Sequence, residues 1–161
     1  MPPQETQSGI VVRKHTPDDF DRLARMNREL IEDEGHRSPL TVEELKERFE
    51  RFVTKEGWSV DLLLSGDEII GFATHRYEDN DTGEGGRCVH LRQFFIARDR
   101  RGGGIGRAAL EELIHTRFRP GERIFLDVLE TNPGGKTFWS RTGFTPYGTI
   151  MEMNVPKDGD S

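Results

Sequence analysis

Two hydrophobic periods alternate along the first half of the chain and predict strands and helices in turn. Residues 10–15 form a short run rich in β-branched side chains, which is typical of a strand. From Phe20 to Ile31 the apolar residues follow helical spacing, and this helix is expected to stop at Gly35. A second helix is predicted from Thr41, because Glu44 completes a capping box with it.

The second half of the chain predicts further strands separated by turns and two more helices. Residues 58–64 and 68–75 flank the turn Ser65-Gly66-Asp67 and are expected to form a hairpin. After a polar, glycine-rich connection at 78–87, the pattern predicts a strand at 88–97, a helix ending near 118, a strand at 123–129, a short helix from 133 and a last strand at 145–155. The order β-α-α-β-β-β-α-β-α-β predicts an α/β (α+β) fold.

Composition limits the classes of protein that fit this pattern. With 161 residues, of which 33% are hydrophobic and 9% aromatic, the chain is expected to form one domain over 1–161, with flexible tails at about 1–9 and 156–161. No apolar run suits a membrane span or a secretion signal, and the single Cys88 allows neither an internal disulfide nor a cysteine metal cluster. These features indicate a cytoplasmic protein without a metal. The net charge of −6 disfavours nucleic acid as a partner.

The stretch RDRRGGGIGRAALEEL, residues 98–113, sets its glycines between a basic cluster and a helical run. A Walker A loop does not fit, because Arg107 and Ala108 follow Gly106 where lysine and serine or threonine are needed. The GxGxxA pattern with Asp127 downstream weakly resembles a dinucleotide-binding fingerprint, but polar residues separate the strand from the glycines and too little chain follows.

Two readings of the glycine loop remain. A merely flexible connection would cost about 1 kcal/mol for a glycine in the first helical turn, relative to alanine. A cradle for pyrophosphate recovers this cost, because glycines let backbone N–H groups approach the ligand, the helix N-terminus adds positive potential, and arginines neutralise phosphate charge. The cradle is therefore favoured.

Two motifs resemble the GNAT superfamily of N-acetyltransferases, in which such a loop holds the pyrophosphate of acetyl-CoA. Residues 101–106, RGGGIG, match the (Arg/Gln)-x-x-Gly-x-(Gly/Ala) signature. Residues 132–144, NPGGKTFWSRTGF, resemble the later motif Asn-x-x-Ala-x-x-Phe-Tyr-x-x-x-Gly-Phe at the same spacing. The predicted order of elements is also that of the superfamily, so the resemblance covers nearly the whole chain. Within it, residues 32–36, 92–96 and 138–139 are similar to those of a bacterial subgroup.

The resemblance implies a GNAT fold with a central mixed, mostly antiparallel sheet of about six or seven strands, flanked by about four helices. The strand before the glycine loop would splay from its parallel neighbour, and the pantetheine arm would lie in the gap. A backbone amide of this strand would polarise the thioester carbonyl. The implied acetyl-CoA-binding residues are Phe94, Phe95, Ile96, Arg101, Gly102, Gly103, Gly104, Ile105, Gly106, Arg107, Asn132 and Phe138.

The implied activity is transfer of an acetyl group to a primary amine of a small molecule or peptide, by direct attack in a ternary complex. Presenting an alkylamine of pKa about 10.4 in its neutral form at pH 7 costs about 4.6 kcal/mol, so a base is useful. The glutamate that many relatives carry before the loop is absent, because Arg92 and Gln93 stand there. Asp127, just ahead of Asn132, occupies the position of the base in some relatives, and a structural carboxylate is the equally weighted alternative.

Trp139 stands where relatives carry the tyrosine thought to protonate the leaving thiolate. Indole cannot give up its proton, although its N–H can donate a hydrogen bond to sulfur. The thiolate of a thiol with pKa about 8.5 lies only about 2 kcal/mol uphill at neutral pH, so Tyr147 or water is a sufficient substitute. The expected catalytic residues are therefore Asp127, Trp139 and Tyr147. The residues held in reserve are Glu34, His36, His75 and His90.

Asp33, Glu34 and the acidic turn at 78–81 are candidates for attracting a cationic amine, although a run of charge is usually a solvated face. The expected partner is thus an amine substrate, with neither nucleic acid nor membrane, and a homodimer is compatible with the sequence. Because both usual catalytic groups are missing, the alternative function is a non-catalytic acyl-CoA sensor module that keeps only the cradle.

Overall fold

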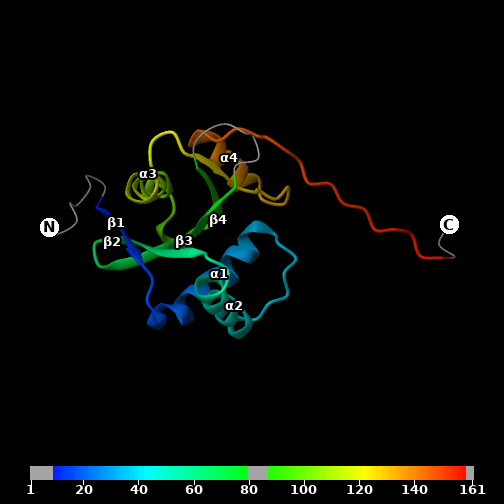
Figure 1. Ribbon diagram of the computed structural model, residues 1–161, viewed down its shortest axis with the longest axis horizontal. Helices are drawn as coiled ribbons and strands as arrows, with labels where there is room; N and C mark the ends of the chain where they lie inside the picture. The colour runs from blue at the N-terminus through cyan, green and yellow to red at the C-terminus, as the bar shows by residue number, and fades with distance from the viewer. Residues whose placement is uncertain (1–8, 80–86, 159–161) are drawn as a thin grey trace.

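The computed structural model describes residues 9–79 and 87–158, in which one sheet separates two layers of helices (Figure 1). The sheet contains β1 (Ile10–Lys14), β2 (Ser59–Ser65), β3 (Glu68–Glu78), β4 (Cys88–Ile96) and β5 (Arg123–Phe125), in that order. The first four strands are antiparallel neighbours, and β5 runs parallel to β4. The predicted mixed, mostly antiparallel sheet is confirmed, with five described strands instead of six or seven.

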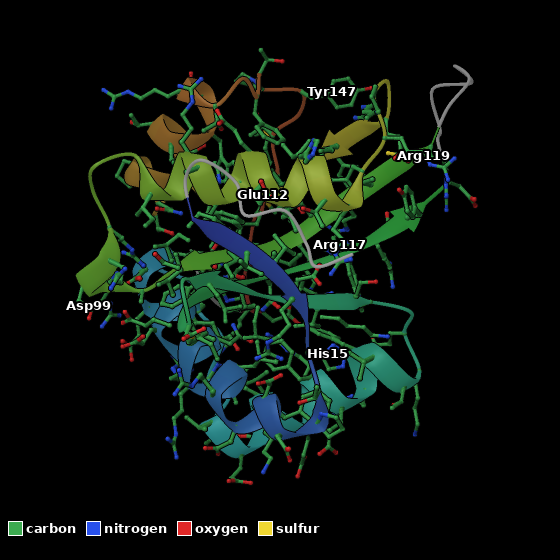
Figure 2. All side chains as sticks on the ribbon, turned by 90° about the vertical axis from the view of Figure 1, so that its left-hand side faces the viewer. His15, Asp99, Glu112, Arg117, Arg119 and Tyr147 are labelled. Atoms are coloured by element: carbon green, nitrogen blue, oxygen red, sulfur yellow. The ribbon has the colours of Figure 1, made fainter. Side chains whose placement is uncertain are left out.

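The four predicted helices are confirmed and lie on both faces of the sheet (Figure 2). On one face, α1 (Phe20–Glu34) and α2 (Val42–Thr54) bury aromatic residues against β2, β3 and β4. On the other face, α3 (Ile105–Arg117) and α4 (Pro133–Arg141) pack on apolar residues of β3, β4 and β5. The start of α2 follows its sequence signal, because the Thr41 hydroxyl accepts a hydrogen bond from the Glu44 amide at 3.2 Å. Every helix in the described ranges is too short or too polar to span a lipid bilayer.

The parallel strands β4 and β5 stay together over only a short distance. Cys88, Val89 and His90 pair with residues 123–125, and β4 then continues to Ile96 without a partner on that side among the described residues. The strand predicted at 123–129 therefore ends at Phe125, because a strand beyond that point has no neighbour to bond. The expected splaying of the two strands is thus present.

The last predicted strand, at 145–155, is wrong for the described structure. This segment is extended, carries no helix or strand assignment, and leads away from the body of the molecule (Figure 1). The alternation of side chains is suitable for a strand, but a strand also needs a partner for its backbone groups, and no described strand pairs with this one. The tails predicted to be flexible lie largely outside the described residues, as do residues 80–86 of the polar connection.

The end of β4 depends on a close approach of two backbones at Gly71. This residue of β3 pairs with Ile96, and a Cβ atom on it would lie only 1.9 Å from the Phe95 carbonyl oxygen. Gly71→Ala must therefore push the two strands apart, at a cost of roughly 1–3 kcal/mol. We expect the melting temperature to fall by about 3 °C or more, measured by calorimetry.

Gly134→Ala is the matched control for this substitution. A Cβ atom there meets nothing within 4 Å, and alanine favours the α4 helix. Its melting temperature should equal that of the wild type or exceed it. Equal melting temperatures for the Gly71 and Gly134 variants would contradict the close approach.

Candidate active site

The glycine loop joins the end of β4 to the start of α3 through a backbone that only glycine adopts without strain. Gly102, Gly103 and Gly104 have φ angles of 97°, 65° and 82°. Gly104 is the N-cap of α3, and its carbonyl oxygen accepts the bond from the Ala108 amide at 3.0 Å. Ile105 donates to the Gly102 carbonyl oxygen at 3.5 Å, whereas the N–H groups of Gly106 and Arg107 have no earlier carbonyl within the helix and lie at its positive end. This end of α3 has the geometry of an anion site.

The arginines beside the loop are bound to carboxylates of α1. Arg101 donates from Nη2 to Asp33 Oδ2 at 2.6 Å and from Nε to the Ile96 carbonyl oxygen at 2.8 Å. Arg98 donates from Nε to the other oxygen of Asp33 at 2.9 Å. Burial opposes the ionisation of Asp33, but these hydrogen bonds outweigh it and hold its pKa below the ordinary value. Arg101 therefore fastens the loop to α1, and the backbone amides are the donors that face outward.

The gap between the splayed strands β4 and β5 is called the opening below. The C-terminal end of α1 also binds the segment that follows β5, on the other side of this opening. The Thr131 hydroxyl, between β5 and α4, donates to the Glu34 carbonyl oxygen at 2.6 Å. The contact is so close that a Cβ atom on Gly35 would lie 2.8 Å from the Thr131 Cβ. One helix end thus holds the segments that follow both splayed strands. Sequence reasoning missed Thr131, and its only local signal is its place next to Asn132.

Glu34 belongs to the same helix end, because it follows Asp33 and its backbone carbonyl accepts the bond from Thr131. It is half-buried, and burial, with a smaller contribution from the neighbouring charge of Asp33, raises its pKa to about 7. A carboxyl group with this pKa exists in both forms at neutral pH, so it can accept a proton and release it again. Glu34 is only a reserve candidate in the sequence analysis. In the structure, its carboxyl group has the largest pKa shift among the carboxyl groups at this end of α1.

An aromatic cluster supports α4 against β4. The Phe138 ring stacks on Phe94 with centroids 6.0 Å apart, and Trp139 meets Phe94 at 5.6 Å. Phe138 also fixes the start of α3, because a Cβ atom on Gly106 would lie 3.2 Å from its ring. Asn132 caps α4 by accepting from the Gly135 amide at 3.0 Å. The motif at 132–144 thus builds the wall beside the splayed strands.

The remaining predicted site residues occupy different parts of the molecule. Arg107 bonds Glu111 one turn along α3 at 3.0 Å, and Asp127 is exposed just beyond β5. Tyr147 is 86% exposed, and its ring lies 5.3 Å from the guanidinium of Arg123, which pairs with the first residue of β4. In Figure 2, Tyr147 and the loop residue Asp99 lie toward opposite ends of α3. Tyr147 is therefore distant from the glycine loop.

Two of the reserve histidines are bound elsewhere. His75 Nε2 lies 2.7 Å from Asp61 Oδ2, and Arg117 holds the other oxygen of Asp61 at 2.7 Å. Together with His15 and other residues, these three line a cavity of about 350 Å³ whose lining contains no residue of the glycine loop. In Figure 2, His15 and Arg117 lie well away from Asp99, which precedes that loop. His90 stacks on Phe125 of β5 at 4.6 Å.

The third reserve histidine, His36, is bonded within the connection that follows α1. His36 is exposed, and its Nδ1 accepts from the Ser38 amide at 3.0 Å. The acidic turn at 78–81 lies partly outside the described residues. Among the acceptor candidates, Asp33 bonds the loop arginines directly, and Glu34 is the residue that follows it in α1.

Comparison with known proteins matches this arrangement to one family. Residues 23–144 match the model of the acetyltransferase (GNAT) family. Because the match covers most of the chain, the protein belongs to this family. No curated protein sequence matches.

Solved structures with the same fold cover most of the chain. The BH1408 protein of Bacillus halodurans is 23% identical, with 90% of this chain and 99% of that chain covered and a TM-score of 0.69. A predicted acetyltransferase of Clostridium acetobutylicum, solved with acetyl-CoA, is 20% identical, with coverage of 90% and 96% and a TM-score of 0.66. An acetyltransferase of Thermus thermophilus is 22% identical, with coverage of 84% and 86% and a TM-score of 0.66.

The environment of Glu34 predicts a pH-dependent effect on stability. The folded protein keeps the proton up to about pH 7, whereas the unfolded chain loses it near the ordinary value of 4.5, so stability falls as pH rises through this window. Glu34→Gln removes the cost of the buried charge. We expect its melting temperature to exceed that of the wild type by about 2 °C or more at pH 8, and by much less at pH 5.

The exposed Glu47 of α2 provides the control, since Glu47→Gln should shift the melting temperature equally at both pH values. A Glu34→Gln effect that does not depend on pH would mean that the carboxylate is well solvated.

Proposed function

We propose that the protein transfers the acetyl group of acetyl-CoA to a primary amine of a small molecule or peptide, in the cytoplasm and without a metal. The observation that carries the proposal is the parting of β4 and β5 directly before a loop of three left-handed glycines and a helix N-terminus. Membership of the acetyltransferase family adds support, as does the acetyl-CoA in the similar Clostridium acetobutylicum structure.

The proposed site binds the parts of acetyl-CoA in the order in which they occur in the molecule, from the pantetheine arm to the pyrophosphate. The amides of Phe94 and Ile96 bond the pantetheine arm in the gap beside β4, where β5 no longer competes for them, whereas the backbone of Phe95 faces β3. The N–H groups of residues 102–107 bind the pyrophosphate at the start of α3. Arg101 acts mainly by holding the loop to Asp33, and its contribution to phosphate binding is secondary. Asn132 and Phe138 form the wall on the α4 side.

The proposed reaction is one direct displacement. The neutral amine attacks the thioester carbonyl carbon, and a β4 amide stabilises the oxyanion that develops. The C–N bond forms, the C–S bond breaks, and the sulfur leaves as thiolate. The proton lost by the amine goes to a carboxylate, and the thiolate takes one from water, with Trp139 able to donate a hydrogen bond to sulfur.

Two carboxylates are candidates for the base. Asp127 has the sequence position of a base in some relatives, but it is exposed beyond β5. Glu34 is half-buried at the end of α1, next to Asp33 and bonded through its carbonyl to Thr131, and burial raises its pKa to about 7. A base works best when its pKa is close to the working pH, so we favour Glu34. Tyr147 stays a less favoured acid because of its distance from the loop.

A sensor that binds acyl-CoA without turnover is the second candidate function. The specific observation in its favour is the replacement of both usual catalytic groups. Gln93 bonds Thr74 at 2.8 Å inside the sheet, and Trp139 is packed among Phe94, Phe138 and Phe144. A sensor would bind acetyl-CoA and leave it intact.

Cofactor binding is tested by Gly104→Val. The wild type should gain roughly 5–10 °C in melting temperature at acetyl-CoA concentrations far above the dissociation constant, and nothing from NADH. Valine at φ +82° distorts the loop backbone and adds a side chain at its surface, so this gain should disappear.

The control Gly66→Val carries the same strain, at φ +60° with open space around it, in the β2–β3 turn. It should lose stability without losing the shift by acetyl-CoA. Loss of the acetyl-CoA shift in both variants, or in neither, would oppose the proposed cradle.

Enzyme and sensor are separated by a panel of amines. With at least one primary amine, the rate at which free thiol is released from acetyl-CoA should exceed the rate of spontaneous hydrolysis. The acetylated amine, measured by mass spectrometry, should appear in the same amount as the thiol. If acetyl-CoA binds but no amine on a broad panel is acetylated, the sensor function is supported instead.

The two carboxylates are compared in Glu34→Gln and Asp127→Asn, with an amine from the panel. If Glu34 is the base, Glu34→Gln should lower kcat about 10²-fold at pH 7 while acetyl-CoA affinity is kept, and Asp127→Asn should change it less than about threefold. The defect should shrink as pH rises toward the pKa of the amine, because the substrate then arrives neutral. The opposite ranking would assign the base to Asp127.

A further inference from the structure

Three arginines gather around two buried aromatic rings on the face of the sheet that α2 covers. The guanidinium of Arg92, on β4, lies 4.7 Å from the centre of the Phe52 ring, and that of Arg48, on α2, lies 5.2 Å from the same ring. Arg92 also lies 5.2 Å from the centre of the Trp58 ring, where Arg76 of β3 lies at 4.0 Å. The rings thus hold three positive groups together, and Arg48, Arg76 and Arg92 are called the arginine cluster below.

The charge of Arg48 is not neutralised within the described residues. Its Nη2 donates to the amide oxygen of Asn27 at 2.8 Å, and its Nε is buried without a described partner. Burial and the like charge of Arg92 lower the pKa of Arg48 to about 10. The exposed Glu56 favours the charged forms of Arg48 and Arg92 but forms an ion pair with neither. An anion between these two arginines would relieve both the burial and the repulsion.

The donors of Arg48 and Arg92 suit one class of ligand. A planar guanidinium binds two oxygens of a carboxylate or a phosphate with paired N–H donors. Beside the glycine loop, Arg98 and Arg101 already donate to Asp33, so their donors are occupied. Arg92, in contrast, donates no hydrogen bond to the described residues, and its contacts are the faces of two rings. The arginine cluster therefore has donors to offer to an oxyanion.

A β-bulge directs Arg92 toward α2. The pairing of β3 with β4 shifts by one residue between Leu91 and Gln93, so Arg92 has no partner on β3. In a regular strand, Arg92 would share a face with Phe94, which packs against α4. The extra residue places Arg92 on the opposite face, over the rings that α2 covers. The bulge thus brings a cation of β4 to the α2 side.

Arg92 also stands where the opening begins. The last pair between β4 and β5 is at His90, so Arg92 is the second residue beyond it. In the proposed site, the coenzyme runs from the pyrophosphate at the glycine loop to the pantetheine arm at Ile96 and Phe94. Its acetyl end then comes next along β4, toward Arg92. A molecule held by the arginine cluster would therefore lie beside the thioester.

We infer that Arg48 and Arg92 bind an oxyanion group, a carboxylate or a phosphate, on the amine that accepts the acetyl group. The inference rests on the proposed function and names the class of its acceptor, an amine that is also an acid. It opposes the expectation of a purely cationic amine, because Asp33 is already paired with arginines and the unpaired charges where the opening begins are positive.

Calorimetric titration of the protein, alone and with CoA, tests the oxyanion site apart from the reaction, because CoA has no acetyl group to transfer. A series of ω-amino carboxylates is compared with the amides of the same chains, and phosphoethanolamine is compared with ethanolamine. At least one acid should bind about tenfold or more tightly than its neutral counterpart, and added salt should weaken its binding. The class that binds more tightly identifies the oxyanion as carboxylate or phosphate.

Substitution of Arg92 tests which residues hold the acid. Arg92→Gln removes the paired donors and should raise the dissociation constant of that acid at least about tenfold, and Arg48→Gln should act in the same way. Arg92→Lys keeps the charge without the planar group and should give an intermediate value. Arg22→Gln is the matched control, because it removes the same charge from an exposed position of α1 and should change binding less than about twofold. Thermal unfolding of each variant checks that the fold is kept.

Turnover separates this inference from the proposed function. With acetyl-CoA, the acid that binds should be acetylated with a higher kcat/KM than its neutral counterpart or a diamine. Neutral amines or diamines that bind or react as well as the acids would overturn the inference, as would a preference that survives in Arg92→Gln or is lost equally in Arg22→Gln. Acids that bind through Arg92 while no amine is acetylated would support the oxyanion site and count against the proposed acetyl transfer.

Discussion

The parting of β4 and β5 is the constraint on which the rest of this structure depends. Three residues of each strand pair, and β4 then runs on to Ile96 with no described strand on that side. Unpaired backbone groups inside a protein must find other partners. The surrounding parts fit this need: α4 and its aromatic residues cover one side, the glycine loop turns away at the end, and the end of α1 holds both arms apart.

The charged side chains next to the glycine loop bond one another and thereby fix its position. The basic cluster ahead of the glycines suggests phosphate contacts, yet Arg98 and Arg101 both bond Asp33 of α1. Backbone amides at a helix N-terminus are fixed dipoles that no side chain can withdraw, so they supply the positive potential without a free cation.

A structural feature could be predicted from the sequence when the residues that form it are close together along the chain. The capping box of Thr41 and the glycine cap of α3 involve neighbouring residues, and both were predictable. The bond between Arg101 and Asp33 joins positions 68 apart, and that between Thr131 and Glu34 joins positions 97 apart, so no local pattern indicates either. The strand predicted at 145–155 is wrong for a third reason: alternation describes what a strand can bury, but a strand also needs a partner for its backbone groups, and no described strand pairs with this segment.

Asp33 and Glu34 are consecutive residues at the end of one helix, and each belongs to a different half of the opening. Asp33 holds the loop that would carry the phosphates, while the Glu34 carbonyl holds Thr131, which follows β5. A ligand that tightens or loosens one half therefore shifts the helix end on which the other half depends. Such a shift is a coupling free energy, and coupling is reciprocal: whatever the coenzyme does to the affinity for the acceptor, the acceptor does equally to the affinity for the coenzyme.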